Sequence, residues 1–259
     1  MAITKYGRFE PCNVSLQLKT CLFTKYGDTW SFFADNYTDS KRNNILTQLI
    51  NWQMNGMISL LSNTDPDCPV SFFDIWGGNP MWNKIAMLES YARYIYSKGG
   101  MFIPCIFCDD GDNHIIQKAP IECHERSISL LLAVLTPFIP AILIGLESSE
   151  YFNRDEHDYF IRLIKHHSPN IFVGTHLQKE PEGGMPTGLD FIAYEHSWSP
   201  VKGDNHSAEE VVNEVIEAKN RWNKIILPVE YNIHFDGRKI REQSKALLKA
   251  GFGCGGPFI

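Results

Sequence analysis

Residues 142–147 read Ile142-Leu143-Ile144-Gly145-Leu146-Glu147, an apolar run that ends in a glutamate. A second run of the same kind is Ile225-Ile226-Leu227-Pro228-Val229-Glu230. Continuous apolar runs are typical of strands buried on both faces, as in a parallel sheet covered by helices. Because the carboxyl ends of such strands meet at one rim, the two runs predict a pair of carboxylates that face each other across the mouth of a barrel.

Strand-like and helix-like segments alternate along the chain. Strands are expected at residues 30–35, 57–61, 101–107, 141–146, 171–174, 190–194, 225–229 and 253–259. Helices are expected at residues 42–56, 80–98 (with Asn79 as N-cap), 121–135, 155–167, 208–222 and 239–250. Eight strands joined by right-handed crossovers predict an α/β fold, a single-domain (β/α)8 TIM barrel that lacks a helix after its last strand.

The length of 259 residues is typical of one such barrel. The barrel is expected to occupy residues 30–259, and residues 1–29 are expected to form an N-terminal extension that packs on it. Within that extension, residues 14–18 and 21–23 could form a small hairpin.

Composition narrows the class of protein. The net charge of −6 argues against nucleic acid as a partner, because phosphate binding usually requires an excess of Lys and Arg. The longest apolar stretch, residues 128–146, is interrupted by Pro137 and Pro140, so no membrane span is expected. The first residues lack the apolar core of a signal peptide, and seven cysteines without regular spacing favour a reducing compartment. We therefore expect a soluble, cytoplasmic protein.

Several short motifs resemble the clan A glycoside hydrolases, which are retaining (β/α)8 barrels. Residues 79–85 (Asn-Pro-Met-Trp-Asn-Lys-Ile), together with 91–94 and 98–104, resemble their second helix and third strand. Residues 146–151 resemble the end of their fourth strand, which carries the acid/base glutamate, and residues 228–231 resemble the end of their seventh, which carries the nucleophile. The clan normally has Asn before the acid/base, whereas this chain has Leu146 before Glu147 and Ser149 before Glu150.

The catalytic candidates are three glutamates. A retaining glycosidase needs a nucleophilic carboxylate and a second carboxyl group that donates and recovers a proton. Glu230 follows its strand directly and is the candidate nucleophile. The acid/base is either Glu147, which the strand pattern favours, or Glu150, which the resemblance favours; alternation along a regular strand prevents both from lying on one face.

Other polar and aromatic residues follow predicted strands and are typical of carbohydrate binding, because sugars offer hydroxyl groups for polar contacts and apolar faces for aromatic stacking. The substrate-binding candidates are Asp35, Asn36, Trp76, Asp109, His176, Tyr194, His196, Trp198 and Tyr231.

No cofactor and no metal is expected. Cys105 and Cys108 have zinc-like spacing, but on a strand positions three apart point to opposite faces. The sequence thus predicts a retaining glycosidase that acts on a β-linked carbohydrate. Two alternatives are a barrel that binds carbohydrate without cleaving it and a barrel enzyme with a non-sugar substrate.

Overall fold

The fold was analysed in a computed structural model. The structure describes residues 22–24, 30–51, 54–63, 69–73, 79–108, 119–195, 206–230 and 237–255. All statements below concern this part of the chain.

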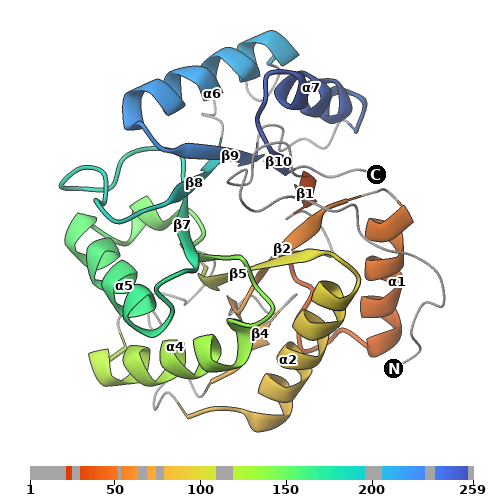
Figure 1. The fold of residues 1–259 in the computed structure, drawn as a ribbon, viewed down its shortest axis with the longest axis vertical. Coiled ribbons are helices and arrows are strands. Elements are labelled where there is room, and N and C mark those ends of the chain that lie inside the picture. Colours follow the sequence, from red (N-terminus) through yellow and green to blue (C-terminus); the bar gives the residue numbers. More distant parts are fainter. Residues whose placement is uncertain are drawn as a thin grey trace.

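Eight parallel strands form one sheet, hydrogen-bonded in the order β10-β1-β2-β5-β6-β7-β8-β9. Strands β9 and β10 contact each other, so the sheet curls into the closed ring of a (β/α)8 barrel (Figure 1). The strands are β1 (Leu22–Thr24), β2 (Gly56–Leu60), β5 (Met101–Phe107), β6 (Ala141–Gly145), β7 (Phe172–Leu177), β8 (Phe191–Glu195), β9 (Ile225–Glu230) and β10 (Cys254–Gly255).

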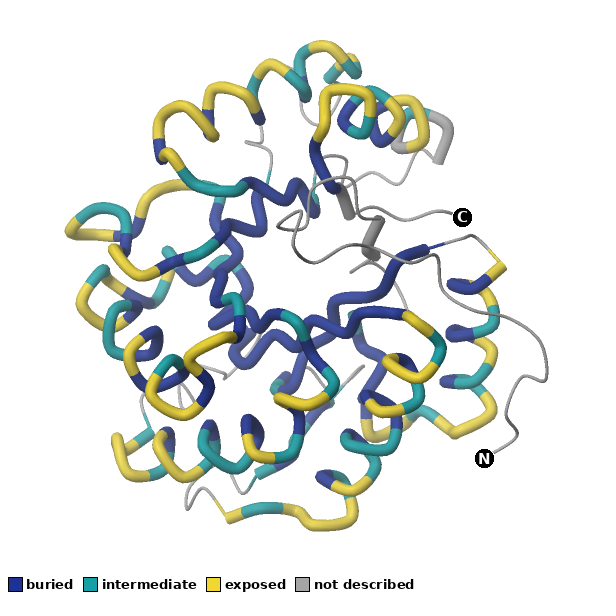
Figure 2. The backbone as a smooth tube through the Cα atoms, in the orientation of Figure 1, coloured by how far each residue is buried: buried dark blue, intermediate teal, exposed yellow. Residues whose placement is uncertain are grey.

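Helices surround this ring, as the sequence predicts. They are α1 (Asp39–Asn51), α2 (Trp82–Ser97), α4 (Ile121–Leu135), α5 (Arg154–His167), α6 (Ala208–Trp222) and α7 (Gly237–Lys249). Strands β2 and β5 to β9 are buried throughout most of their length and the helices expose their outer faces (Figure 2). A short antiparallel pair, β3 (Ser62–Asn63) and β4 (Val70–Ser71), follows β2. A 3₁₀ turn, η4 (Ser148–Glu150), follows β6.

Side chains alternate between the barrel interior and the helix layer along each strand. Leu143 and Leu227 belong to the interior cluster, whereas Ile142 and Ile226 pack in the clusters under the helices. Phe191 also fills the interior, and a Cβ on Gly174 would lie 2.5 Å from its ring. Glycine on β7 therefore makes room for a large ring, and the barrel centre is a packed core with the functional groups above it.

Two local predictions are wrong. Residues 30–35 form turns, and the first barrel strand is instead Leu22–Thr24, which pairs with β2 and β10. The barrel thus includes part of the segment 1–29; that the rest of this segment is an extension stays a prediction. Asn79 is not the N-cap of α2, because Pro80 pairs with Phe73 and the helix begins after Met81. Phe32 and Phe33 are buried in the cluster under α1 and α2, so burial rather than strand pairing explains that pattern.

None of the helices in the described ranges combines the length and apolar character needed to cross a bilayer.

Candidate active site

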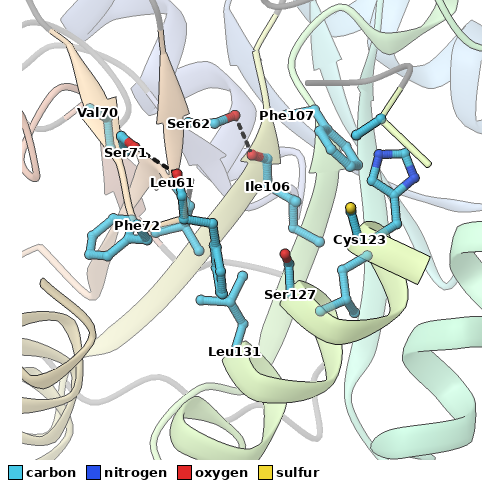
Figure 3. A pocket seen from close by; sticks show the side chains of 14 residues that line it. Leu61, Ser62, Val70, Ser71, Phe72, Ile106, Phe107, Cys123, Ser127 and Leu131 are labelled. Atoms are coloured by element: carbon cyan, nitrogen blue, oxygen red, sulfur yellow. Dashed lines mark hydrogen bonds between the residues drawn. The ribbon is translucent and has the colours of Figure 1, made fainter. Parts of the chain in front are cut away.

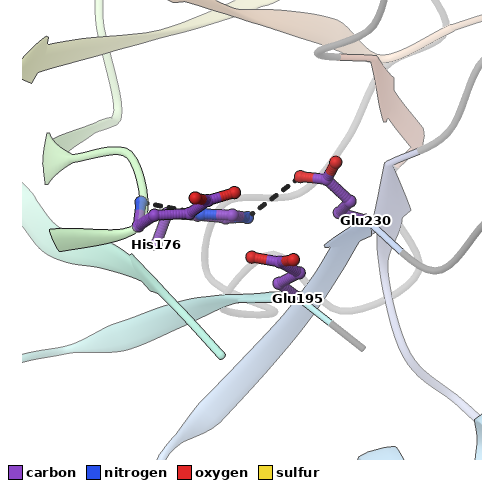
Figure 4. Close-up of side chains that lie close together, drawn as sticks. His176, Glu195 and Glu230 are labelled. Carbon is purple, nitrogen blue, oxygen red and sulfur yellow. Dashed lines mark hydrogen bonds and ion pairs between the residues drawn. The ribbon is translucent and has the colours of Figure 1, made fainter. Parts of the chain in front are cut away.

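A cluster of three glutamates and one histidine lies at the carboxyl ends of four neighbouring strands. Glu147 follows β6, His176 is on β7, Glu195 ends β8 and Glu230 ends β9. One ligand atom from each side chain lies within 4.8 Å of the others. The labelled side chains in Figure 4 converge from adjacent strands toward the barrel mouth. The two glutamates that end the apolar runs therefore meet, as their strand positions predict.

Glu147 has an unusual backbone. Its φ of 44° and ψ of 35° lie in the left-handed region, which costs a residue other than glycine about 1–3 kcal/mol. The Glu147 N–H donates a hydrogen bond of 3.0 Å to His176 Nδ1. The Leu146 carbonyl before it accepts a bond of 2.6 Å from the Tyr151 hydroxyl. These contacts hold the turn that aims the carboxylate of Glu147 at the cluster.

The buried Ser148 anchors the same turn. Its hydroxyl lies 2.8 Å from His157 Nε2 and also contacts the Thr175 hydroxyl. His157 Nδ1 lies 2.8 Å from the Asn153 carbonyl, which can only accept, so Nδ1 carries the proton and Nε2 accepts from Ser148. Burial lowers the pKa of His157 and keeps the ring neutral in this arrangement.

Glu195 is a member of the cluster that sequence reasoning left out of the catalytic set. Phe191 and Ala193 on β8 face the barrel interior, and Glu195 continues that alternation. Tyr194 faces the other way: its hydroxyl donates to Glu214 and its ring packs 5.7 Å from that of Trp222, both on α6. Tyr194 therefore points to the helix layer and away from the cluster, and that it binds substrate stays a prediction. Counting in steps of two from Phe191 would have selected Glu195.

A β-bulge turns Glu230 toward the cluster. Leu227 and Val229 on β9 face the interior, so regular alternation would direct Glu230 to the helices. Tyr194 pairs with Pro228, however, and Glu195 pairs with Glu230, so β9 has one extra residue at this point. Such bulges re-aim side chains at functional sites. The Glu230 side chain is 14% exposed and its Oε2 lies 3.6 Å from His176 Nε2.

Of the remaining candidates, four lie in the described part of the chain and five do not. Glu150 is exposed at the end of η4, and Asp35 pairs with Lys84 of α2 at 2.6 Å; neither belongs to the cluster, nor does the exposed Asn36. His176 does belong to it, but its ring is only 1% exposed and both nitrogens face glutamates. The others lie outside the described residues: Trp76, Asp109, His196, Trp198 and Tyr231.

The cluster is also the one group of potential metal ligands found in the described ranges. Its carboxylates could bind a hard cation. His176 is a poor ligand in this geometry, because Nδ1 already accepts a hydrogen bond and the proton of the neutral ring then lies on Nε2. Cys105 and Cys108 both lie in the interior cluster, so the expectation that they face opposite sides is wrong; the strand loses its regular alternation near Phe107. That the protein uses no metal stays a prediction.

A separate apolar pocket lies between the β3–β4 pair, β5 and α4 (Figure 3). Leu61, Phe72, Phe107 and Leu131 are among its lining residues, and the described lining includes no carboxylate. Glycoside hydrolysis normally uses a pair of carboxyl groups, which the described lining of this pocket lacks, so the barrel mouth is the stronger candidate.

Comparisons with known proteins agree on the fold. Neither a protein-family model nor a curated protein sequence matches the chain. Among solved structures, an exo-beta-1,4-mannosidase from Opitutaceae bacterium strain TAV5 is similar with a TM-score of 0.66 at 12% identity. The similarity covers 98% of this chain and 54% of that one, so the chain spans about half the length of that enzyme.

Two further structures are similar over most of their own length. A glycoside hydrolase family 5 enzyme from Prevotella bryantii B14 has a TM-score of 0.65 at 12% identity, covering 96% of this chain and 91% of that one. A beta-1,4-D-mannanase from Cryptopygus antarcticus has a TM-score of 0.61 at 10% identity, covering 90% of this chain and 83% of that one. The chain thus has a barrel fold of the kind found in family 5 glycoside hydrolases.

Proposed function

We propose that the protein is a glycoside hydrolase that cleaves a β-linked glycosidic bond with retention of configuration. The observation that carries the proposal is the approach of carboxylate oxygens of Glu147 and Glu230 to within 4.8 Å of each other. Retaining enzymes hold their two carboxyl groups about 5–5.5 Å apart, whereas inverting enzymes need about 6.5–9.5 Å to admit water between them. The fold similarity to a mannosidase and a mannanase supports the same class.

Glu230 is the proposed nucleophile and Glu147 the proposed acid/base. In the first step a Glu230 oxygen bonds to the anomeric carbon while the bond to the leaving oxygen breaks and that oxygen takes the proton of Glu147. In the second step water attacks the anomeric carbon, Glu147 takes a proton from the water, and the ester bond to Glu230 breaks. Glu150 is disfavoured as the acid because it lies outside the cluster.

Glu195 adds a third carboxylate beside this pair, within 4.8 Å of both by its nearest oxygen. Gln178 Nε2 lies 3.4 Å from its Oε1, a long contact that holds it against β7. Two carboxyl groups complete the reaction, so we assign Glu195 to the binding of sugar hydroxyl groups, which donate readily to a carboxylate.

The test begins with the parent protein and a panel of aryl β-glycosides that includes the mannoside and the glucoside. NMR of the first product is expected to show the β anomer. Azide should rescue the Glu230→Ala variant to give an α-glycosyl azide and the Glu147→Ala variant to give a β-glycosyl azide. The Glu147→Ala variant should hydrolyse substrates with poor leaving groups about 10²–10⁴-fold more slowly than the parent.

The Glu150→Ala variant is the matched control, because it removes a neighbouring carboxylate that lies outside the cluster. It should keep the parent rate. A first product with the α anomer would contradict retention, and a loss in Glu150→Ala equal to that in Glu147→Ala would contradict the assignment of the acid.

A second candidate function is carbohydrate binding without hydrolysis. It is favoured by Leu146, an apolar and 6% exposed residue at the position where the resembled clan has Asn. Binding of an oligosaccharide in calorimetry, without release of product from any glycoside of the panel, would support this function over the first.

A further inference from the structure

His176 occupies a place between the two proposed catalytic glutamates. It shares the inward face of β7 with Phe172 and Gly174, one step above the packed interior. Its side chain is only 1% exposed. Such burial leaves little ring surface for a sugar, although sequence reasoning expects His176 to bind substrate.

The contacts of the ring fix where its proton lies. Nδ1 accepts a hydrogen bond of 3.0 Å from the Glu147 N–H, and a nitrogen that accepts carries no proton. The proton of the neutral ring therefore lies on Nε2, the nitrogen that faces Glu230 Oε2 at 3.6 Å. A protonated ring would place an N–H of its own against the Glu147 N–H, so the observed contact requires the neutral form.

The two contacts act on the two glutamates in different ways. The bond to the Glu147 backbone stabilises the turn after β6. This turn has a left-handed backbone conformation that costs free energy in a glutamate. The Nε2–H presents a positive edge to the carboxylate of Glu230. At 3.6 Å the contact is longer than a hydrogen bond, so it orients the carboxylate and leaves the attacking lone pair available.

We propose that His176 is a positioning residue that sets the nucleophile through its Nε2–H and the acid/base through the Glu147 backbone. This role rests on the proposed hydrolysis by Glu230 and Glu147. Because only 1% of its side chain is exposed, His176 acts on the two glutamates and not on the sugar, by fixing two groups from two different strands in one geometry. A misplacement of about 1 Å at either carboxylate is sufficient to cost about 100-fold in rate.

Three substitutions separate the two contacts. His176→Phe keeps a planar ring and removes both, and it should lower kcat about 100-fold while KM changes less than about twofold. His176→Asn keeps an acceptor near Nδ1 and removes the donor to Glu230, so it should slow substrates with good and poor leaving groups alike. His176→Gln keeps a donor near Nε2 and removes the acceptor for Glu147, so it should slow mainly substrates whose leaving oxygen needs protonation.

The control is His124→Phe, which replaces a buried histidine of α4 whose ring packs against Phe107 and Phe160, outside the cluster. It should keep the parent kcat and KM. An unchanged kcat in His176→Phe, or a loss confined to KM, would overturn the positioning role. Equal leaving-group dependence in the Asn and Gln variants would overturn the division between the two glutamates.

A measurement without turnover separates this proposal from the proposed function. Imidazole ¹⁵N spectra of the parent protein at neutral pH should show His176 protonated on Nε2 and unprotonated on Nδ1. An Nδ1–H tautomer would overturn the role of His176 even if glycosides are cleaved. Failure of the parent to cleave any glycoside would overturn the proposed hydrolysis, whereas the Nε2–H tautomer would then still show the bridge between the two strands.

Discussion

Two turns in the described part of the chain place a residue other than glycine in the left-handed region, and they differ in what they cost. Asn223 (φ 49°, ψ 42°) ends α6, and Glu147 (φ 44°, ψ 35°) follows β6. Asn tolerates this backbone and is a common choice after a helix, whereas Glu gains nothing from it. The helix end thus uses a residue suited to its conformation, and the strand end uses a residue that the conformation disfavours.

The surroundings of the two turns explain the difference. The Asn223 N–H donates to the Lys219 carbonyl at 2.9 Å, an ordinary end to a helix that needs no further support. The Glu147 turn is held by the Ser148 hydroxyl, which bonds His157 of α5, by the Tyr151 hydroxyl, which bonds the Leu146 carbonyl, and by the His176 ring of β7. A disfavoured backbone conformation persists where several surrounding contacts hold it, and such conformations are concentrated at functional sites. The comparison therefore supports the proposal that Glu147 belongs to the active site.

The largest effect on stability is expected from Ser148→Ala. This change leaves the buried Thr175 hydroxyl and His157 Nε2 without their common partner, at a cost of about 1–3 kcal/mol. The free energy of unfolding in urea measures the loss. Ser129→Ala is the matched control, because that hydroxyl bonds the Arg126 carbonyl at an exposed position of α4, and its effect should stay within about 0.5 kcal/mol. Equal losses would show that the Glu147 turn has no special support.

A smaller effect of opposite sign is expected from Glu147→Gly. Glycine adopts the left-handed backbone without strain, so the free energy of unfolding should rise by about 1 kcal/mol while hydrolysis is lost. Glu147→Ala removes the carboxylate and keeps the strain, so it should not stabilise. Asn223→Gly should change stability by only a few tenths of a kcal/mol, because Asn already suits its turn. Stabilisation of equal size at both positions would remove the contrast between the turns.

The smallest effect is expected on the pH dependence of stability, and it comes from the His157 ring. Burial lowers the pKa of His157 below 6.5, its value in the unfolded chain, so below pH 6.5 the unfolded state binds the proton first. Stability that is present above pH 6.5 is therefore lost as the pH falls from 6.5 toward the pKa of His157 in the folded protein. The His157→Gln variant should lose less stability than the parent between pH 7 and pH 5, measured by urea unfolding. Asn223→Gly should follow the parent, and an unchanged pH dependence in His157→Gln would argue against a buried neutral ring.

The sequence by itself determined the architecture and named three of the four cluster residues, Glu147, His176 and Glu230. Apolar runs at β6 and β9 require burial on both faces, and alternation with helices requires a parallel barrel, so Glu147 and Glu230 had to approach one rim. Strand alternation along β8 also contained the signal for Glu195. These features are local in sequence, since they depend on the period of a strand and on what a strand can bury.

Only the tertiary structure decided how these groups are aimed. The bulge in β9 exists in the pairing with β8, and regular alternation alone would have turned Glu230 away from the cluster. The proposed choice of Glu147 over Glu150 depends on a turn that two residues of β7 hold in place, His176 through the Glu147 N–H and Thr175 through the Ser148 hydroxyl. Even the first strand, Leu22–Thr24, is defined by its partners β2 and β10. A sequence specifies which side chains a strand offers, whereas hydrogen bonds between distant segments fix where the offered groups point.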